Sequence, residues 1–290
     1  MKTQKSFEAT EKGTVYIVPT PIGNLEDITY RALKILQSSA LIAAEDTRNT
    51  KKLLTHFEIT TSLISYHDHN KESRGHQLME RLENGESIAF VSDAGMPGIS
   101  DPGYEMVQSA IEASIPVVVL PGANAALCAL IGSGLPTTEF LFYGFLPRKK
   151  KDRIKELERM KPLQATLLFY ESPHRLKETV SAIQEQFGER QVTLARELTK
   201  RFEEYIRGSI AEVLQWIHDT ELRGEFCIVV EGNAENTISD EGLWWSHLSV
   251  MKHIAHYMEE ESMSSKDAIK KVAVERQMPK REVYQTYHIG

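Results

Sequence analysis

The chain has 290 residues, of which 41% are hydrophobic and 26% are charged, and its formal net charge is −7. This composition is typical of a globular protein long enough for two domains, and the acidic balance excludes a protein coated in positive potential, such as a polybasic membrane binder. No run approaches the roughly 18 apolar residues of a membrane span, and the polar N-terminus has no apolar signal-peptide core. We therefore expect a cytoplasmic protein that does not bind membranes. Its two cysteines, Cys128 and Cys227, each lie in an apolar run, so we expect both to be small buried residues that form neither a disulfide framework nor a zinc site.

The first 121 residues alternate short apolar runs with segments of helical periodicity. Continuous apolar strands separated by helices indicate a parallel sheet that is covered on both faces. We therefore predict an α/β domain over residues 1–121, with strands in the apolar runs 14–18, 40–44, 62–66, 87–91 and 116–120.

The next 113 residues, 122–234, contain apolar runs that are not all separated by helices. QVTLAR and EEYIRG, for example, follow each other closely, which favours antiparallel pairing. This pattern predicts a second α/β domain with a mixed sheet. After the polar stretch 232–242 the periodicity is helical, so we predict a small helical C-terminal region over residues 235–290.

Four loops rich in glycine, proline and small residues follow predicted strands of the first domain, at residues 19–24, 43–52, 91–103 and 120–126. Ligands of open α/β sheets bind at the carboxyl ends of the strands. Each loop alone could be a tight turn, but the length and glycine content of VSDAGMPGISDPG favour a binding loop. The first loop lacks the G-x-G-x-x-G pattern, which disfavours a standard dinucleotide-binding oxidoreductase.

A set of motifs extends this pattern over about residues 14–231: TPIGNLEDIT, AAEDTR, VSDAGMPGISDPG, LPGANA, GFLPRKK, FYESPHRL and ARELTKRFEE. Together they resemble the ribosomal RNA small subunit methyltransferase I family, a branch of the tetrapyrrole methylase superfamily (class III S-adenosylmethionine-dependent methyltransferases). The resemblance implies two α/β domains with S-adenosylmethionine between them, a homodimer, and methylation of a cytidine 2′-hydroxyl in 16S ribosomal RNA of the small subunit. Met96 and Ala123–Asn124 depart from the threonine and Pro-Ser that are commoner in the family.

The resemblance also implies which residues contact the cofactor. Backbone groups of glycine and proline loops suit its charged methionine end, small apolar residues suit adenine, and a carboxylate suits the cationic sulfur. The implied contacts are Pro21, Asp93, Gly95, Met96, Gly122, Ala125 and Ala126 from the first domain side, and Phe169, Ala195 and the turn Gly224–Phe226 from the second.

Methyl transfer to a ribose hydroxyl also needs a group that accepts the hydroxyl proton. Lys200 could do so only with a lowered pKa, and a lone histidine is more often a structural donor, so the sequence leaves the base open. We predict a catalytic set of Asp46, Arg48, Glu171 and Lys200. The candidates for the proton acceptor are Glu45, Asp46, Glu171, His174, Glu197 and Lys200.

A basic cluster is the main signal for RNA. Residues 148–161 contain eight basic and three acidic side chains and follow the apolar run FYGFL, which places them beside the expected cleft. A small-molecule methylase acting on a tetrapyrrole would need no such cluster, and a non-enzymatic ribosome-assembly factor remains a further alternative. The predicted RNA-binding residues are Arg148, Lys149, Lys150, Lys151, Arg175 and Arg196.

Two further patterns suggest a metal site and a helical module. His67-Asp68-His69 has the spacing of a metal site but no neighbouring ligand cluster, and this methyl transfer requires no metal, so we expect none. In the tail, Ser265 can cap a helix that presents Ala268, Ile269, Val272 and Ala273 on one face, and a second helix begins after Pro279. This pattern fits a helix-turn-helix unit or a packing and dimerisation module equally well.

Overall fold

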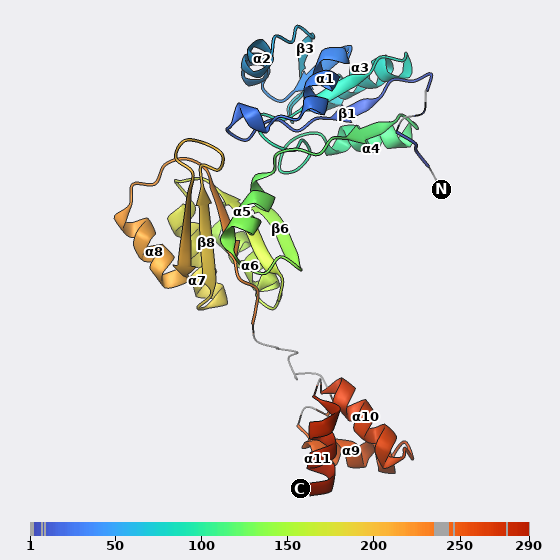
Figure 1. The fold of residues 1–290 in the computed structure, drawn as a ribbon, viewed down its shortest axis with the longest axis vertical. Helices are drawn as coiled ribbons and strands as arrows, with labels where there is room; N and C mark the ends of the chain where they lie inside the picture. Colours follow the sequence, from blue (N-terminus) through green and yellow to red (C-terminus); the bar gives the residue numbers. More distant parts are fainter. Residues whose placement is uncertain are drawn as a thin grey trace. The chain divides into compact units, whose positions relative to one another are not determined.

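A computed structural model describes residues 3–6, 8, 10–234, 244–245, 247–276 and 278–289 of the chain. The chain divides into two compact units, Met1–Ala234 and Glu235–Gly290, which are shown in Figure 1. Most of the predicted polar connection, from residue 235 to 242, and the residue Leu243 that follows it lie outside the described residues.

The first sheet is parallel throughout, as the continuous apolar runs predicted. Its five strands are arranged in the order β3-β2-β4-β1-β5, so β4 lies between β2 and β1, and each pair of neighbours is parallel. The strands are β1 (Val15–Ile17), β2 (Leu41–Ala44), β3 (Leu63–Ser65), β4 (Ile88–Val91) and β5 (Val117–Val119).

Helices cover both faces of this sheet. Leu41 and Ala43 point to a core shared with α3 (Lys71–Glu83) and α4 (Tyr104–Glu112). Their neighbours Ile42 and Ala44 point to the opposite core, which is shared with α1 (Tyr30–Ser38) and α2 (Thr47–His56). Since successive side chains of a strand face opposite ways, a strand buried on both faces must be apolar at every position.

The outer edge of β5 is closed by a side chain. The amide of Gln4 donates from Nε2 to the Val117 carbonyl (2.8 Å) and accepts from the Val117 N–H at Oε1 (2.9 Å). The side chain thus makes both hydrogen bonds that a residue of a neighbouring strand would make.

The second sheet is mixed, also as predicted. Its order is β6-β7-β10-β8-β9, in which β6 and β7 are parallel and the other pairs are antiparallel. The close succession of QVTLAR and EEYIRG is the antiparallel pair β8–β9. The strands are β6 (Phe140–Phe145), β7 (Thr166–Glu171), β8 (Gln191–Arg196), β9 (Glu204–Ser209) and β10 (Phe226–Val230).

Helix α5 (Ala125–Ser133) covers one face of the second sheet (Figure 1). The other face packs against α6 (Lys150–Met160), α7 (Leu176–Phe187) and α8 (Ile210–Asp219). Arg153 of α6 is only 1% exposed and pairs with Glu178 of α7. One of the eight basic side chains of the predicted RNA-binding segment is therefore structural.

The unit 235–290 contains the helices α9 (Val250–Glu259), α10 (Ser265–Glu275) and α11 (Lys280–Ile289). The predicted apolar face of α10 is buried together with residues of α9 and α11. The predicted cap is wrong by one position: Ser264, not Ser265, precedes the helix and accepts a hydrogen bond from the Asp267 N–H at Oγ (3.3 Å).

Candidate active site

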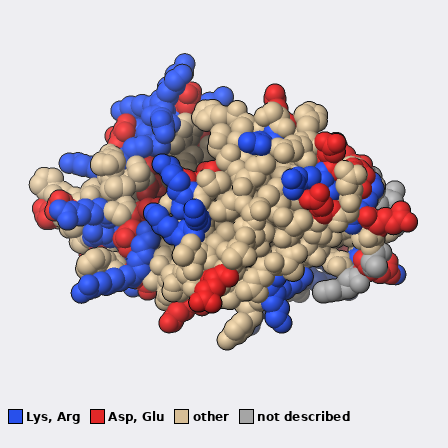
Figure 2. Space-filling model, turned by 90° about the horizontal axis from the view of Figure 1, so that it is seen from above, with Lys and Arg blue, Asp and Glu red and all other residues tan. Residues whose placement is uncertain are grey.

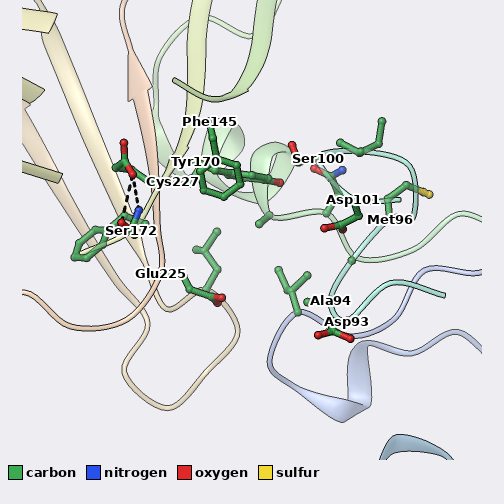
Figure 3. A pocket seen from close by; sticks show the side chains of 18 of the residues that line it. Asp93, Ala94, Met96, Ser100, Asp101, Phe145, Tyr170, Ser172, Glu225 and Cys227 are labelled. Atoms are coloured by element: carbon green, nitrogen blue, oxygen red, sulfur yellow. Dashed lines mark hydrogen bonds between the residues drawn. The ribbon is translucent and has the colours of Figure 1, made fainter. Parts of the chain in front are cut away.

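A cavity of about 400 Å³ lies at the carboxyl ends of the first sheet's strands and opens toward the second sheet. We call it the large cavity. Figure 3 shows Asp93 and Asp101 on one side of it and Tyr170 and Glu225 on the other. Its lining is Ile22, Glu45, Asp93, Ala94, Gly95, Met96, Ile99, Ser100, Asp101, Asn124, Ala125, Phe145, Tyr170, Glu171, Ser172, Pro173, Ala195, Leu198, Glu225, Phe226 and Cys227.

The loops after β1 and β4 are joined beside this cavity. Thr20 and Gly95 exchange two backbone hydrogen bonds, of 2.9 and 3.0 Å. Gly95 has a φ of +77°, which a glycine adopts without strain, and a Cβ there would lie 3.2 Å from Cγ2 of Ile22. The predicted binding loop 91–103 is therefore joined to the predicted loop 19–24 by backbone hydrogen bonds.

Glu45, Asp93 and Asp101 form a group of carboxylates along the cavity, which we call the acidic wall. Burial, followed by the charge of Glu45, raises the pKa of Asp101 to about 7. Burial and the charge of Asp93 likewise raise the pKa of Glu45. The described residues that line the large cavity include no Lys, Arg or His, so this wall attracts cations.

Asp93 is fixed from two directions. Its Oδ1 accepts from the Asp46 N–H (3.1 Å) and its Oδ2 accepts from Nδ2 of Asn49 (3.1 Å). Both donors lie where β2 ends and α2 begins, so the side chain of Asp93 connects the loops after β2 and β4.

The opposite side of the cavity contains Tyr170 and small or apolar side chains. The Tyr170 hydroxyl accepts a hydrogen bond from the Ala126 N–H (3.2 Å) at the start of α5. Burial raises the pKa of Tyr170 to about 12, so the hydroxyl keeps its proton. Phe169, which the resemblance implied as a cofactor contact, directs its fully buried side chain into the core on the other face of the sheet.

The other implied cofactor residues fall into two groups. The large cavity is lined by Asp93, Gly95, Met96, Ala125, Ala195, Glu225 and Phe226. The remaining four are close to it but do not line it: Pro21 borders a neighbouring cavity, Gly122 packs against Pro19, Ala126 binds the Tyr170 hydroxyl, and Gly224 packs against Glu197.

Asp46 and Arg48 form an ion pair at the start of α2. Hydrogen bonds from the Arg48 side chain and backbone hold the pKa of Asp46 down, at about 2. The side chain of Arg48 is 87% exposed. A carboxyl with so low a pKa is a weak proton acceptor, so this pair is better suited to orienting Asp93, to which the Asp46 N–H donates.

Glu171 is buried and its oxygens are occupied. Oε1 accepts from the Ser172 N–H (2.8 Å) and Oε2 accepts from the Thr179 hydroxyl (2.7 Å). Arg175 lies 3.5 Å from the same carboxylate. These contacts favour a role in shaping the cavity.

Lys200 donates to Glu197 (2.9 Å) and to Glu225 (2.8 Å), which lines the cavity. Burial would lower the pKa of Lys200, but the hydrogen bonds to the two carboxylates outweigh it and raise the pKa. Hydrogen bonds from Lys200 and from the Glu225 N–H lower the pKa of Glu197 against the effect of its burial. The lysine therefore remains charged and positions Glu225.

The predicted RNA-binding residues fall into two groups. Arg148, Lys149, Lys150 and Lys151 are exposed where α6 begins, just after Phe145, which lines the large cavity. Lysines at a helix N-terminus oppose the helix dipole, so they do not serve the stability of α6. Arg175 donates to the Leu146 carbonyl (2.9 Å), and Arg196 to the Arg223 carbonyl (2.9 Å).

Charge is unevenly distributed over the surface. On the face shown in Figure 2, Lys and Arg gather mostly toward the left of the view, with acidic side chains among them. His174 is exposed, and the His67–His69 segment does not belong to any metal-ligand cluster in the described part of the chain. None of the described helices is long and apolar enough to span a membrane.

Comparisons with known proteins identify the family of this chain. Residues 14–214 match the model of the tetrapyrrole (corrin/porphyrin) methylases. Proteins named ribosomal RNA small subunit methyltransferase I are 55% identical in Halalkalibacterium halodurans, over 99% of both chains, and 54% identical in Bacillus subtilis, over 100% of this chain and 99% of the relative. The chain belongs to the ribosomal RNA small subunit methyltransferase I family.

Solved structures confirm the fold of this methyltransferase. Cobalt precorrin-4 methyltransferase matches with a TM-score of 0.58 at 14% identity, over 75% of this chain and 94% of that one. Uroporphyrin-III C-methyltransferase from Thermus thermophilus, in complex with S-adenosylhomocysteine, matches with a TM-score of 0.52 at 18% identity, over 75% and 97%.

Members of this family take the methyl group from S-adenosylmethionine, and the large cavity fits that cofactor. The acidic wall suits its sulfonium and ammonium groups, and the small apolar side chains around Tyr170 suit its adenine. The start of α5, where Asn124 and Ala125 line the cavity, suits a carboxylate.

Proposed function

We propose that this protein transfers a methyl group from S-adenosylmethionine to the 2′-oxygen of a cytidine in 16S ribosomal RNA of the small subunit. The observation that carries the proposal is the acidic wall of the large cavity, in a chain whose 54–55% identical relatives are named ribosomal RNA small subunit methyltransferase I. When bound, the cofactor supplies an electrophilic methyl group on a positively charged sulfur.

The acidic wall also provides the acceptor for the hydroxyl proton. A base works best when its pKa lies near the working pH, and the carboxyl of Asp101, with a pKa of about 7, meets that condition. Asp46, with a pKa of about 2, does not. In this proposal Asp46, Arg48, Glu171 and Lys200 position the reacting groups, and the acidic wall takes the proton.

The exposed cluster Arg148–Lys151 holds the RNA backbone in this proposal. These four basic side chains do not stabilise their own helix, and they lie close to Phe145, which lines the large cavity. Their positive charges suit a chain of phosphates. Arg175 and Arg196 each donate a hydrogen bond to a backbone carbonyl and thereby stabilise the walls of the cavity. They would contact phosphates only if these hydrogen bonds were broken.

We further propose that the active form is a cytoplasmic homodimer. Helix α5 is apolar on every side, and its face away from the sheet exposes Leu127 (49%), Ile131 (71%) and Cys128. The prediction that Cys128 is buried is therefore wrong for the single chain. A helix that is apolar all round is normally buried on all sides, and a second copy would bury this face. Ile131→Asp should then yield a monomer in analytical ultracentrifugation, whereas a monomeric parent protein would contradict the proposal.

The reaction is tested with small subunits from a strain that lacks the enzyme. After incubation with methyl-labelled S-adenosylmethionine, nucleoside mass spectrometry should find the label in 2′-O-methylcytidine. Label on a base would contradict the ribose assignment, and absence of label from RNA would contradict the substrate. Label in an added tetrapyrrole instead would favour a small-molecule methylase.

A further inference from the structure

A second cavity, of about 220 Å³, lies beside the large cavity and is called the small cavity here. The loop after β1, the first turns of α2 and the end of β4 form its walls, and Asp93 lines both cavities. Its lining is Thr20, Pro21, Gly23, Leu25, Asn49, Thr50, Lys52, Leu53, Ser92 and Asp93.

The lining of the small cavity has the chemistry of a nucleoside pocket. Asn49 and Thr50 supply neutral hydrogen-bonding groups, and Leu25, Leu53 and Pro21 supply apolar surface. A nucleoside needs both, since its base has polar edges and apolar faces. The volume is about half that of the large cavity, which suits a single residue of a polymer rather than a macrocycle.

The helix above this cavity is basic. From Thr47 to His56, α2 contains Arg48, Lys51 and Lys52 and no Asp or Glu. Both lysines are exposed, and Lys52 is the basic residue in the lining of the small cavity. Phosphates on either side of a nucleotide in the pocket would meet these side chains.

The two cavities therefore differ in charge, as expected if one binds the cationic cofactor and the other binds part of an RNA. The large cavity is lined by the acidic wall and suits a cation, while the small cavity has a lysine at its side and suits part of a polyanion. Asp93, held by Asp46 and Asn49, lies where the two cavities meet.

We propose that the small cavity receives the target nucleotide, with its ribose toward Asp93 and its flanking phosphates along α2. This inference rests on the proposed function, because it assigns the acceptor site of that reaction. In this arrangement Asp93 lies beside the point where the 2′-oxygen meets the methyl group, and the hydroxyl loses its proton to the acidic wall as the oxygen–methyl bond forms and the methyl–sulfur bond breaks.

The charge of the small cavity is tested with Lys52→Glu, and its matched control is Lys34→Glu, the same change at an exposed position of α1. Lys52→Glu should raise the KM for unmethylated small subunits about tenfold and flatten its dependence on salt. The affinity for S-adenosylhomocysteine, measured by calorimetry, should stay within twofold of the parent in both variants.

The space in the small cavity is tested with Leu25→Trp, which fills it from a side chain that is already 39% exposed. Leu25→Ala, which enlarges the cavity, is the control. Leu25→Trp should lower kcat/KM for small subunits more than tenfold, and Leu25→Ala much less, with thermal stability unchanged.

Three results separate the possible failures. If Lys52→Glu and Leu25→Trp methylate subunits like the parent, the acceptor assignment is wrong and the proposed function stands. If Leu25→Trp weakens S-adenosylhomocysteine binding as much as it weakens methylation, the small cavity belongs to the cofactor. If the parent protein leaves RNA unlabelled, the proposed function itself fails.

Discussion

The backbone N–H of Asp46 donates to the carboxylate of Asp93 across 3.1 Å, and this bond joins the loop after β2 to the loop after β4. Parallel strands that lie side by side deliver their following loops to one edge of the sheet, and β2 and β4 are neighbours. The acidic wall is therefore a product of strand order, since Glu45 follows β2 whereas Asp93 and Asp101 follow β4.

Asp93→Asn should weaken cofactor binding, because it removes one negative charge from the acidic wall while keeping the shape of the side chain. The loss should be greater for S-adenosylmethionine, which carries the sulfonium charge, than for neutral-sulfur S-adenosylhomocysteine. We expect about a tenfold loss for the cation, which corresponds to ~1.4 kcal/mol. Calorimetry with both ligands checks this, with Asp152→Asn on α6 as control. Equal losses for the two ligands would contradict an electrostatic role.

The pKa of Asp101 gives the stability of the protein a defined dependence on pH. The carboxyl titrates at about 7 in the folded protein and at 3.8 when unperturbed, so between these values the folded state binds more protons than the unfolded state. The free energy of unfolding therefore falls as the pH rises from about 4 to about 7, and it loses nothing further from this group above that range.

Asp101→Asn removes this contribution. From pH 5 to pH 7 the free energy of unfolding, measured with urea, should fall less in Asp101→Asn than in the parent. The difference should be roughly 1 kcal/mol, a value that allows for the partial exposure of the carboxyl. Asp152→Asn should behave like the parent. A parallel pH dependence in Asp101→Asn and the parent would show that Asp101 titrates normally.

The double variant Lys149→Glu/Lys150→Glu should bind RNA more weakly without being less stable. Glutamates at the start of α6 favour the helix dipole, so a loss of binding cannot be ascribed to unfolding. We expect a loss of about tenfold or more in affinity for small subunits and a slope against salt that is lower by ~2. The control is Lys34→Glu/Lys177→Glu, with the same charge change at exposed positions of α1 and α7. Equal effects of both pairs would contradict a local contact.

Gly224→Ala should destabilise the protein by about 1–3 kcal/mol. The residue has a φ of +81°, and an added Cβ would lie 2.4 Å from Cγ of Glu197, which binds Lys200. Gly75→Ala is the contrasting control, because Gly75 lies within α3 with nothing within 4 Å of an added Cβ. That change should stabilise the protein by ~0.5–1 kcal/mol. Chemical unfolding measures both, and a neutral Gly224→Ala would contradict the close packing.

The sheets could be predicted from the sequence because their strands are buried on both faces and therefore apolar throughout. Because these strands are apolar throughout, their sequence does not show which side chains line the cavity. Phe169 and Tyr170 are adjacent in LLFYE, and only the register of β7 decides that Tyr170 lines the cavity while Phe169 lies in the core.

The burial of Arg153 could have been predicted from its position in the helix, which a count of local charges does not consider. It lies four residues before Leu157 and seven before Met160, on the face of α6 that is buried. The raised pKa of Asp101, in contrast, depends on burial and on Glu45 from another loop, so no local pattern could have revealed it.

The hydrogen bonds of Gln4 with Val117 have a consequence for shortened chains. They occupy an N–H and a carbonyl on the free edge of β5, which is otherwise open to strand addition by another molecule. Removing the first ten residues would leave the fold's cores intact but expose this edge. Aggregation of such a chain would then reflect intermolecular β-pairing and would say nothing about the integrity of the catalytic region.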